Sequence, residues 1–442
     1  NRVHLTEVAP VYKLPQRAWM DAIERADSEV LIGAPNTTKE DQERAFLVSL
    51  DSDESLLELA RLAETAGAQV IGTMLQRKTR PDTATYIGSG KADELSLACQ
   101  AREADVVIFD DELSGVQTRN LEEILHGAKV IDRTTLILDI FAQRAQSREG
   151  RLQVELAQMA YQLPRLLGHG VAMSRLGGGI GTRGPGEKKL EMDRRLIHAR
   201  ISQLKAELAQ VQKHRELIRS KRKKDQMVVA AIVGYTNAGK STLLNTLTDA
   251  GVLEEDKLFA TLDPTTRLLE LPGGQNILLT DTVGFIRKLP HHLIEAFKST
   301  LEEAKYADII IHVVDASNPQ KEKQMHVVYE TLKDLGVKDQ PILTLFNKQD
   351  RIENPEILKD MKADKTLKIS AKTGQGLDDL KDELEKILRA RSILLERVFP
   401  YEKAGLIQIV RAKGQLLEEE YRGDGIYVKA FVPAEIYGKV AY

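Results

Sequence analysis

The sequence predicts an α/β protein of several domains, and three patterns along its 442 residues carry that prediction. Short apolar runs rich in β-branched residues alternate with helix-length segments through residues 45–146. Two apolar stripes at helical spacing follow in residues 147–224, and a uniformly apolar run at 227–233 then leads into a glycine-rich turn and a helical pattern. Alternating strands and helices are typical of a parallel sheet with crossover helices, which places the chain in the α/β class.

Composition excludes several classes of protein. Apolar residues make up 42% and charged residues 29%, as in globular proteins that dissolve in water. The single cysteine, Cys99, allows no internal disulfide and no cysteine-based metal cluster. No run approaches the ~20 apolar residues of a membrane helix, and the first residues show no signal-peptide pattern. We therefore expect a cytoplasmic protein without a membrane span, and we assume a monomer.

Residues 1–146 are expected to form an N-terminal α/β domain, although residues 1–44 show no clear pattern. Its strands are expected at 46–50, 69–74, 105–110 and 129–132, and its helices near 53–66, 90–103, 114–126 and 134–146. The turn Gly88-Ser89-Gly90-Lys91 resembles part of a phosphate-binding loop. It lacks the glycine required at Thr85 and has Ala92 in place of Ser or Thr, so we favour a simple helix start.

Residues 147–224 are expected to form an antiparallel helical hairpin. One apolar stripe consists of Leu152, Leu156, Met159, Leu163 and Leu167, and the other of Leu190, Ile197, Ile201, Leu204, Leu208, Val211 and Ile218. Such stripes at helical spacing indicate two helices that pack against each other. Between Gly168 and Gly186, 8 of 19 residues are glycine, which predicts a connecting loop.

The same region is strongly basic. Residues 144–224 hold 19 Lys and Arg against 7 Asp and Glu, whereas the whole chain carries a net charge of −3. A localised basic segment favours contact with a polyanion such as RNA, and the alternative is a solvated helix face. The candidate RNA-binding residues are Arg165, His169, Arg175, Arg183, Lys188, Lys189, Arg194 and Arg195. The glycine-rich loop is then a flexible probe, with a disordered connector as the alternative.

The strongest motif follows the strand at 227–233. Gly234-Tyr235-Thr236-Asn237-Ala238-Gly239-Lys240-Ser241 fully matches G-x-x-x-x-G-K-[ST], and Thr242 begins the helical pattern after it. The backbone N–H groups of such a loop and helix N-terminus bind phosphates. Lys240 is expected to reach the β- and γ-phosphates, and the Ser241 hydroxyl to bind Mg²⁺.

Three downstream motifs identify the nucleotide as GTP. Each follows an apolar strand: Asp281-Thr282-Val283-Gly284, Asn347-Lys348-Gln349-Asp350 and Ser370-Ala371-Lys372. Asp281 is expected to hold Mg²⁺ through water, and the Gly284 N–H to contact the γ-phosphate. Asp350 can accept the N1–H and 2-amino hydrogens of guanine, which adenine cannot offer, while Lys348 covers the ring and the Ala371 N–H donates to O6.

A nucleotide-sensing segment is expected between these motifs. In LFATLDPTTR at 258–267, the residues Phe259, Ala260, Thr261, Leu262 and Asp263 are candidate nucleotide contacts. Thr261 is the preferred third Mg²⁺ ligand, with Thr265 and Thr266 as competitors. The segment is expected to be ordered with GTP and to relax with GDP.

The chain resembles the HflX family of bacterial GTPases from about residue 45 to its end. The resemblance rests on GYTNAGKS, FATLDPT, DTVGFIRKLP, NKQD and SAK, and also on GGIGTRGPGE and KVIDRTTLILDIFAQRA. It implies an N-terminal α/β domain with a helical hairpin, a Ras-like P-loop GTPase domain at 225–391 and a small C-terminal α+β domain at 392–442. It also implies a factor that binds the large ribosomal subunit and the intact ribosome through rRNA, and that splits or rescues stalled ribosomes under stress.

Hydrolysis is expected to be slow without a partner. Phe285 stands where Ras-type enzymes place a glutamine that orients the attacking water. Lys240, Gly284 and Mg²⁺ would stabilise charge, and Arg287, His291 and His292 receive no catalytic role. Asn237 matches the spacing of GTPases that use K⁺, so K⁺ is a further candidate cofactor.

Two other functions stay open at this point. One is a GTP-switched RNA-binding factor in assembly of the large subunit, which never splits ribosomes. The other is an ATP-driven RNA remodeller that uses the Gly88–Lys91 turn.

Overall fold

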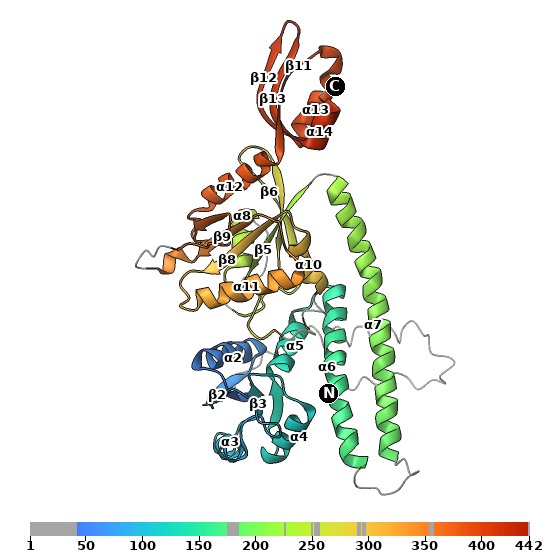
Figure 1. Cartoon of the computed structure of the whole chain (residues 1–442), viewed down its shortest axis with the longest axis vertical. Helices are drawn as coiled ribbons and strands as arrows, with labels where there is room; N and C mark the ends of the chain where they lie inside the picture. Colours follow the sequence, from blue (N-terminus) through green and yellow to red (C-terminus); the bar gives the residue numbers. More distant parts are fainter. Residues whose placement is uncertain are drawn as a thin grey trace, which may run out of the picture.

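The computed structural model describes residues 42–174, 185–224, 227–248, 257–289, 298–352 and 358–440, with Gly251 and Leu293. Within these residues the chain forms three β-sheets and a pair of long helices (Figure 1). The predicted mixed α/β class is confirmed. None of the helices in the described ranges has the length and apolar character needed to cross a bilayer.

The N-terminal sheet is parallel and has the order β2-β1-β3-β4. Its strands are β1(Arg44–Ser49), β2(Gln69–Leu75), β3(Val106–Phe109) and β4(Lys129–Asp132), and its helices are α2(Asp53–Ala66), α3(Ser89–Ala101), α4(Gly115–Ile124) and α5(Arg133–Arg144). Apolar side chains of α2 and α5 pack on one face of the sheet, and those of α3 and α4 on the other. The predicted strands and helices are confirmed. Gly88 is the N-cap of α3, so the Gly88–Lys91 turn starts a helix, as favoured from the sequence.

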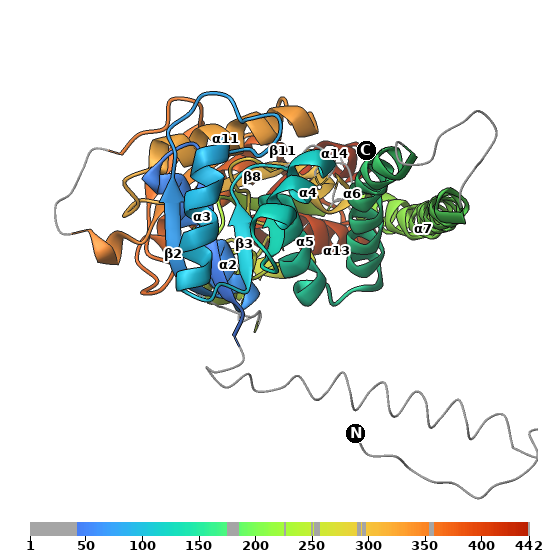
Figure 2. The ribbon, with the colours of Figure 1, turned by 90° about the horizontal axis from the view of Figure 1, so that it is seen from below.

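The hairpin consists of α6(Arg148–Ser174) and α7(Pro185–Lys224), which lie side by side in Figure 1. Leu152 of α6 packs with Leu204 and Leu208 of α7. Seen from below in Figure 2, α7 lies beyond α6, to one side of the N-terminal sheet.

The predicted loop at 168–186 is partly wrong. The helix α6 continues to Ser174, and α7 already begins at Pro185, so only residues 175–184 remain outside the described ranges. A glycine inside a helix costs only about 0.5–1 kcal/mol, and each added residue of a formed helix gains a hydrogen bond. Glycine content alone therefore predicted the end of this helix too early.

The central sheet has six strands in the order β10-β9-β8-β5-β7-β6, of which only β6 is antiparallel to its neighbour. The strands are β5(Val228–Gly234), β6(Thr265–Glu270), β7(Asn276–Asp281), β8(Ile309–Asp315), β9(Ile342–Asn347) and β10(Lys365–Lys368). The helices are α8(Lys240–Thr248), α10(Lys298–Tyr306), α11(Lys321–Leu335) and α12(Leu377–Ala390), with the short 3₁₀ turn η3(Gln349–Arg351). Helices α8 and α12 cover one face, while α10 and α11 cover the other.

A small antiparallel sheet ends the chain. It consists of β11(Ser392–Phe399), β12(Gln415–Arg422) and β13(Gly425–Pro433), in the order β11-β13-β12. Helices α13(Ala404–Lys413) and α14(Ala434–Val440), with the 3₁₀ turn η4(Tyr401–Lys403), complete the unit, and its buried side chains form a separate core. This is the α+β module that the resemblance implied.

One hydrophobic core, called the shared core below, runs from the N-terminal sheet into the central sheet. It includes Leu59 and Phe141 from the N-terminal helices, and Phe259, Leu262 and Phe285 from the segments around the predicted phosphate site. The rings of Phe141 and Phe259 pack edge to face, with centroids 4.8 Å apart. The segments that are expected to sense the nucleotide are therefore packed against the N-terminal domain.

Candidate functional site

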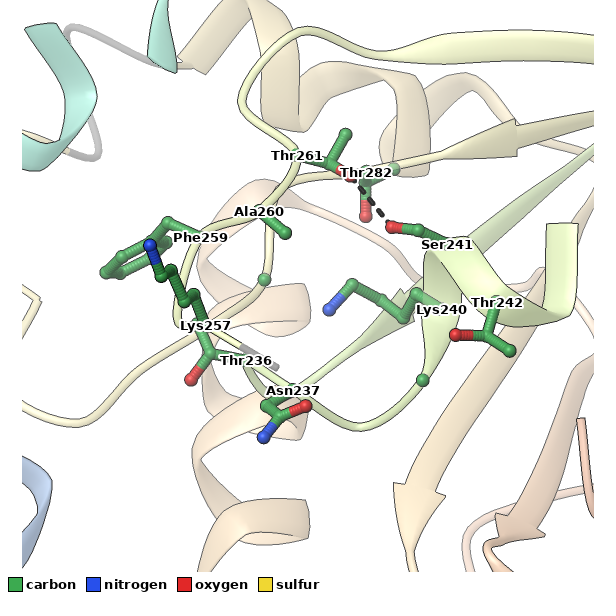
Figure 3. Close-up of a pocket in the computed structure, with 12 residues that line it drawn as sticks. Thr236, Asn237, Lys240, Ser241, Thr242, Lys257, Phe259, Ala260, Thr261 and Thr282 are labelled. Atoms are coloured by element: carbon green, nitrogen blue, oxygen red, sulfur yellow. Dashed lines mark hydrogen bonds between the residues drawn. The ribbon is translucent and has the colours of Figure 1, made fainter. Parts of the chain in front are cut away.

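The phosphate loop leaves β5 at Gly234 and enters α8 at Lys240. Gly234 has φ +156°, and a Cβ there would lie 2.3 Å from the Val313 carbonyl oxygen, so only glycine fits. Gly239 has φ +96°, and a Cβ there would lie 2.3 Å from the Asn347 side chain. These close approaches wrap the loop around the pocket that Figure 3 shows.

Lys240 is buried at the centre of this pocket. Its Nζ donates to the Tyr235 carbonyl oxygen at 2.9 Å. Burial lowers the pKa of Lys240 to about 8, although the Asp281 carboxylate raises it. The hydroxyl of Thr236 nearby is buried and has no partner among the described residues. A bound phosphate would pair with the ammonium and accept from such a hydroxyl, so the pocket fits the β- and γ-phosphates.

Three oxygen-bearing side chains, those of Ser241, Thr261 and Asp281, meet beside Lys240. The Ser241 hydroxyl donates to Asp281 Oδ2 at 2.7 Å and lies 2.8 Å from Thr261 Oγ1. Asp281 Oδ1 is buried without a hydrogen-bond partner in the described chain, and burial raises the pKa of this carboxyl group. Two hydroxyls and one carboxylate match the oxygen ligands of Mg²⁺, and a cation would satisfy the orphaned oxygen. The residues present therefore fit Mg²⁺, which would neutralise phosphate charge there.

Some residues of the segment 258–263 line the pocket, and others contact the rest of the protein. Phe259, Ala260 and Thr261 line the pocket (Figure 3), together with Lys257, which sequence reasoning missed. Leu262 is buried in the shared core, and the carboxylate of Asp263 accepts hydrogen bonds from residues at the start of α6. The expectation that Leu262 and Asp263 contact the nucleotide is therefore not supported. The competitors Thr265 and Thr266 lie in β6, where Thr266 Oγ1 meets Thr280 Oγ1 at 3.0 Å.

The base-recognition motifs meet next to the phosphate loop. Asn347 Nδ2 donates to the Ala238 carbonyl at 2.9 Å, and Lys348 Nζ donates to the Asn237 carbonyl at 2.8 Å. Lys348 also pairs with Asp315 at 2.8 Å, a residue that the sequence analysis missed although it directly follows an apolar strand. These bonds fix the loop and the base motif to each other.

The other residues that are expected to contact the base, Asp350 and Ala371, form hydrogen bonds with neighbouring loops. The Ser370 hydroxyl donates to Asp350 Oδ1 at 2.6 Å, and this bond lowers the pKa of Asp350, which keeps the carboxylate ionised. The Ala371 N–H donates to Asn347 Oδ1 at 2.8 Å, so its predicted bond to guanine O6 would have to share that hydrogen. Lys372 follows at the exposed end of this loop.

The segment after Gly284 is tied to the phosphate loop and to the N-terminal domain. The Thr236 N–H donates to the Phe285 carbonyl at 2.8 Å, and the Phe285 side chain is only 1% exposed in the shared core. Arg287 N donates to the Tyr235 hydroxyl at 2.9 Å, and its guanidinium donates to Ser55 Oγ at 2.8 Å. Lys288 pairs with Asp110 at 3.0 Å. Val283 is buried beside them, and Thr282 donates to the β5 backbone.

The predicted RNA-binding residues have different surroundings in the structure. Arg165 pairs with Asp132 and stacks on Tyr161, so its guanidinium is used inside the protein rather than offered to RNA. Arg194 and Arg195 are exposed on α7. His169, Lys188 and Lys189 lie on the two helices, but their side chains lie outside the description. Arg175, Arg183, His291 and His292 lie outside the described residues.

Comparison with known proteins identifies the family. The chain is 59% identical over 409 residues to the GTPase HflX of Lacrimispora saccharolytica, covering 91% of this chain and 96% of that protein. The chain belongs to the HflX family of GTPases. It is also 43% identical to the GTPase HflX of Escherichia coli over 346 residues, which are 76% of this chain and 81% of that one.

Family models match three consecutive parts of this HflX-family chain. They are described as the GTP-binding GTPase N-terminal region, at residues 53–142, the GTP-binding GTPase middle region, at 144–222, and a 50S ribosome-binding GTPase, at 229–348. Among solved structures, the chain is similar to a GTP-binding protein from Sulfolobus solfataricus in complex with GDP, with 27% identity and a TM-score of 0.44 over 78% of this chain and 98% of that one. Membership of the HflX family of GTPases, together with the match to the 50S ribosome-binding GTPase model, shows that the chain binds GTP and hydrolyses it to GDP and phosphate.

Proposed function

We propose that this HflX-family GTPase binds the large ribosomal subunit through rRNA and, with GTP bound, splits or rescues stalled ribosomes under stress. One observation carries the proposal: both segments that flank the phosphate site are attached to the N-terminal domain. Asp263 binds residues before α6, and Lys288 binds Asp110 at the end of β3. The nucleotide can therefore control how the N-terminal domain and the basic hairpin are presented. The match to a family described as a 50S ribosome-binding GTPase supports the ribosome as the partner.

The hairpin offers the surface for RNA. Arg194, Arg195, Lys205 and Lys213 are exposed along α7, which runs along one side of the chain in Figure 1. Contacts between such cations and phosphates release counterions, so binding should weaken steeply with salt. Residues 175–184 connect the ends of α6 and α7 and carry two further arginines, Arg175 and Arg183.

Hydrolysis on this proposal depends on a partner. Lys240 and the Gly284 N–H stabilise phosphate charge, and Ser241, Thr261 and Asp281 would hold Mg²⁺. Phe285 is buried in the shared core and has no polar group for the attacking water. Basal turnover is therefore slow, and ribosome binding is expected to stimulate it.

K⁺ is a second proposed cofactor. Asn237 lies on the rim of the phosphate pocket with φ +61°, at the loop position where some GTPases bind K⁺. Replacing K⁺ by Na⁺ at equal ionic strength should lower ribosome-stimulated turnover. Unchanged turnover would remove K⁺ from the proposal.

Sedimentation of intact ribosomes tests the proposal. With GTP or a non-hydrolysable analogue, the protein should convert ribosomes into subunits and stay on the large one, whereas GDP should not. If ribosomes stay intact in every lane and protein is found only on free large subunits, the function is instead that of a GTP-switched assembly factor.

A further inference from the structure

The N-terminal cap of α6 is held in place by a residue from a distant part of the chain. The Ser147 hydroxyl accepts a hydrogen bond from the Gly150 N–H at 2.9 Å, which is the ordinary capping bond of a helix N-terminus. The same hydroxyl donates its hydrogen to Asp263 Oδ1. Asp263 Oδ2 accepts from the N–H groups of Gln146 at 3.0 Å and of Ser147 at 2.7 Å. One carboxylate thus binds two backbone donors and orients the capping hydroxyl.

Asp263 lies on the segment 258–267, which is expected to sense the nucleotide. It is two residues beyond Thr261, whose hydroxyl meets Ser241 in the proposed Mg²⁺ site. Between them, Leu262 is buried in the shared core. The start of the segment is fixed as well, because the Leu258 N–H donates to Thr65 Oγ1 at 3.3 Å. The chain between Thr261 and Asp263 is too short to let one move far without the other.

We propose that Asp263 is a positioning residue that couples the Mg²⁺–GTP site to helix α6: Thr261 binds at the metal when Asp263 holds the Ser147 cap of α6, and Asp263 releases that cap when Thr261 leaves. This inference deepens the proposed function, since it rests on the premise that the nucleotide controls the hairpin. Asp263 therefore acts through Thr261, without contacting GTP itself.

The coupling has a predictable size. Loss of one hydrogen bond typically costs about 1 kcal/mol, which corresponds to about a fivefold change in an equilibrium constant. Because linkage is reciprocal, a contact that favours the GTP-bound arrangement by this factor also raises the affinity for GTP, relative to GDP, by the same factor. Removing the Asp263 carboxylate should therefore lower the affinity for a non-hydrolysable GTP analogue about fivefold relative to the affinity for GDP.

The first test measures nucleotide affinities of the purified full chain without ribosomes. Asp263→Ala should reduce the ratio of analogue to GDP affinity about fivefold and raise the Mg²⁺ concentration needed for tight analogue binding. Asp263→Asn, which keeps one acceptor oxygen, should restore part of the ratio. An unchanged ratio in Asp263→Ala would overturn the proposal.

A second variant acts from the helix side. A Cβ on Gly150 would lie 2.5 Å from Asp263 Oδ1, so Gly150→Ala must displace the carboxylate. Alanine also favours the helix more than glycine does, which means that a weaker helix cannot explain its effect. Gly150→Ala should therefore lower the affinity ratio in the same direction as Asp263→Ala, and an unchanged or raised ratio would contradict the coupling.

The matched control is the cap of α4. Ser114 accepts from the Gln117 N–H at 3.2 Å in a capping box on the far face of the N-terminal sheet. Ser114→Ala removes a comparable cap and should leave the affinity ratio unchanged, and an equal drop in the ratio would mean that general destabilisation explains the effect and would overturn the proposal.

Hydrogen exchange measures directly how well the N-terminus of α6 is protected. Amides of residues 146–150 should exchange more slowly with the analogue than with GDP in the wild type, and Asp263→Ala should abolish this difference. Equal exchange in the two wild-type states would refute the coupling. Because no ribosome is present in these assays, failure of the coupling and failure of the ribosomal function give separate results.

Discussion

Arg133 should be one of the most sensitive positions for stability in the N-terminal domain. Its side chain is 2% exposed and pairs with Asp110, which is fully buried, at 2.9 Å and also with Glu58. Its guanidinium further donates to the Arg287 carbonyl oxygen at 3.1 Å, which links the cluster to the segment after Gly284. Arg133→Met keeps much of the side-chain volume and removes the charge, so the substitution isolates the electrostatic contribution.

The expected cost follows from these contacts. Removing one partner of a buried ion pair typically costs about 3–5 kcal/mol, because the other charge stays buried. Asp110 keeps bonds to Ser49 at 2.9 Å and to Lys288 at 3.0 Å, which favours the lower end of that range, about 3 kcal/mol. The control is Arg119→Met, because Arg119 pairs with Glu123 on the surface of α4, where such a pair is worth about 0.5 kcal/mol or less.

Urea unfolding followed by circular dichroism measures the effect as a shift of the midpoint at unchanged slope. Arg133→Met should shift the N-terminal transition far more than Arg119→Met. Adding Asp110→Asn to Arg133→Met should cost less than the sum of the single changes, since it removes the unpaired charge. Equal midpoints for the two arginine variants, or strict additivity with Asp110→Asn, would refute the reasoning.

Four further predictions concern the nucleotide site, the hairpin and the central sheet. Lys240→Ala should abolish tight GTP binding or turnover, and normal GTPase activity would disprove the phosphate site. Asp350→Asn should shift the preference from guanine to xanthine nucleotides, measured by competition binding, and retained GTP selectivity would exclude its role. Deleting residues 170–184 should leave intrinsic GTPase activity but weaken the effect on ribosomes, and surviving ribosome splitting would show that this segment is not needed. Burial lowers the pKa of His312 to about 4, below the pKa of about 6.5 that histidine has in the unfolded chain. The contribution of neutral His312 to the free energy of unfolding is therefore present above about pH 6.5 and is lost as the pH falls towards 4. Between pH 7 and pH 5 the loss is about 2 kcal/mol. Replacing His312 by Gln should flatten that loss in unfolding experiments, whereas exposed His214→Gln should not, and equal pH slopes would contradict the assignment.

Local patterns were enough to predict the strands of the N-terminal sheet and the strand and helix that flank the phosphate loop. The strands at 44–49 and 228–234 are short apolar runs, and their ends could be placed within two residues. The phosphate loop follows from a fixed spacing, since binding a phosphate requires given residue types at given intervals. Spacing did not separate Thr261 from Thr265 and Thr266, and the fold places the Thr261 hydroxyl 2.8 Å from that of Ser241.

Contacts between distant segments could not be predicted in this way. Asp263 appeared to be a nucleotide contact because it lies in a nucleotide-sensing motif, and only the fold shows that it binds Gln146 and Ser147, more than a hundred positions away. Arg165 appeared to be an RNA ligand because its neighbourhood is basic, but it pairs with Asp132. Composition carries no information about which charge faces inward, so such pairings need the tertiary structure.

The most direct test of the central claim is the equilibrium binding of the wild-type protein to isolated large ribosomal subunits. Binding would be compared with a non-hydrolysable GTP analogue and with GDP, at several salt concentrations. The account predicts tight binding with the analogue, weak binding with GDP, and a steep loss of affinity with rising salt. Equal affinity in the two nucleotide states would contradict control of ribosome binding by the GTP site.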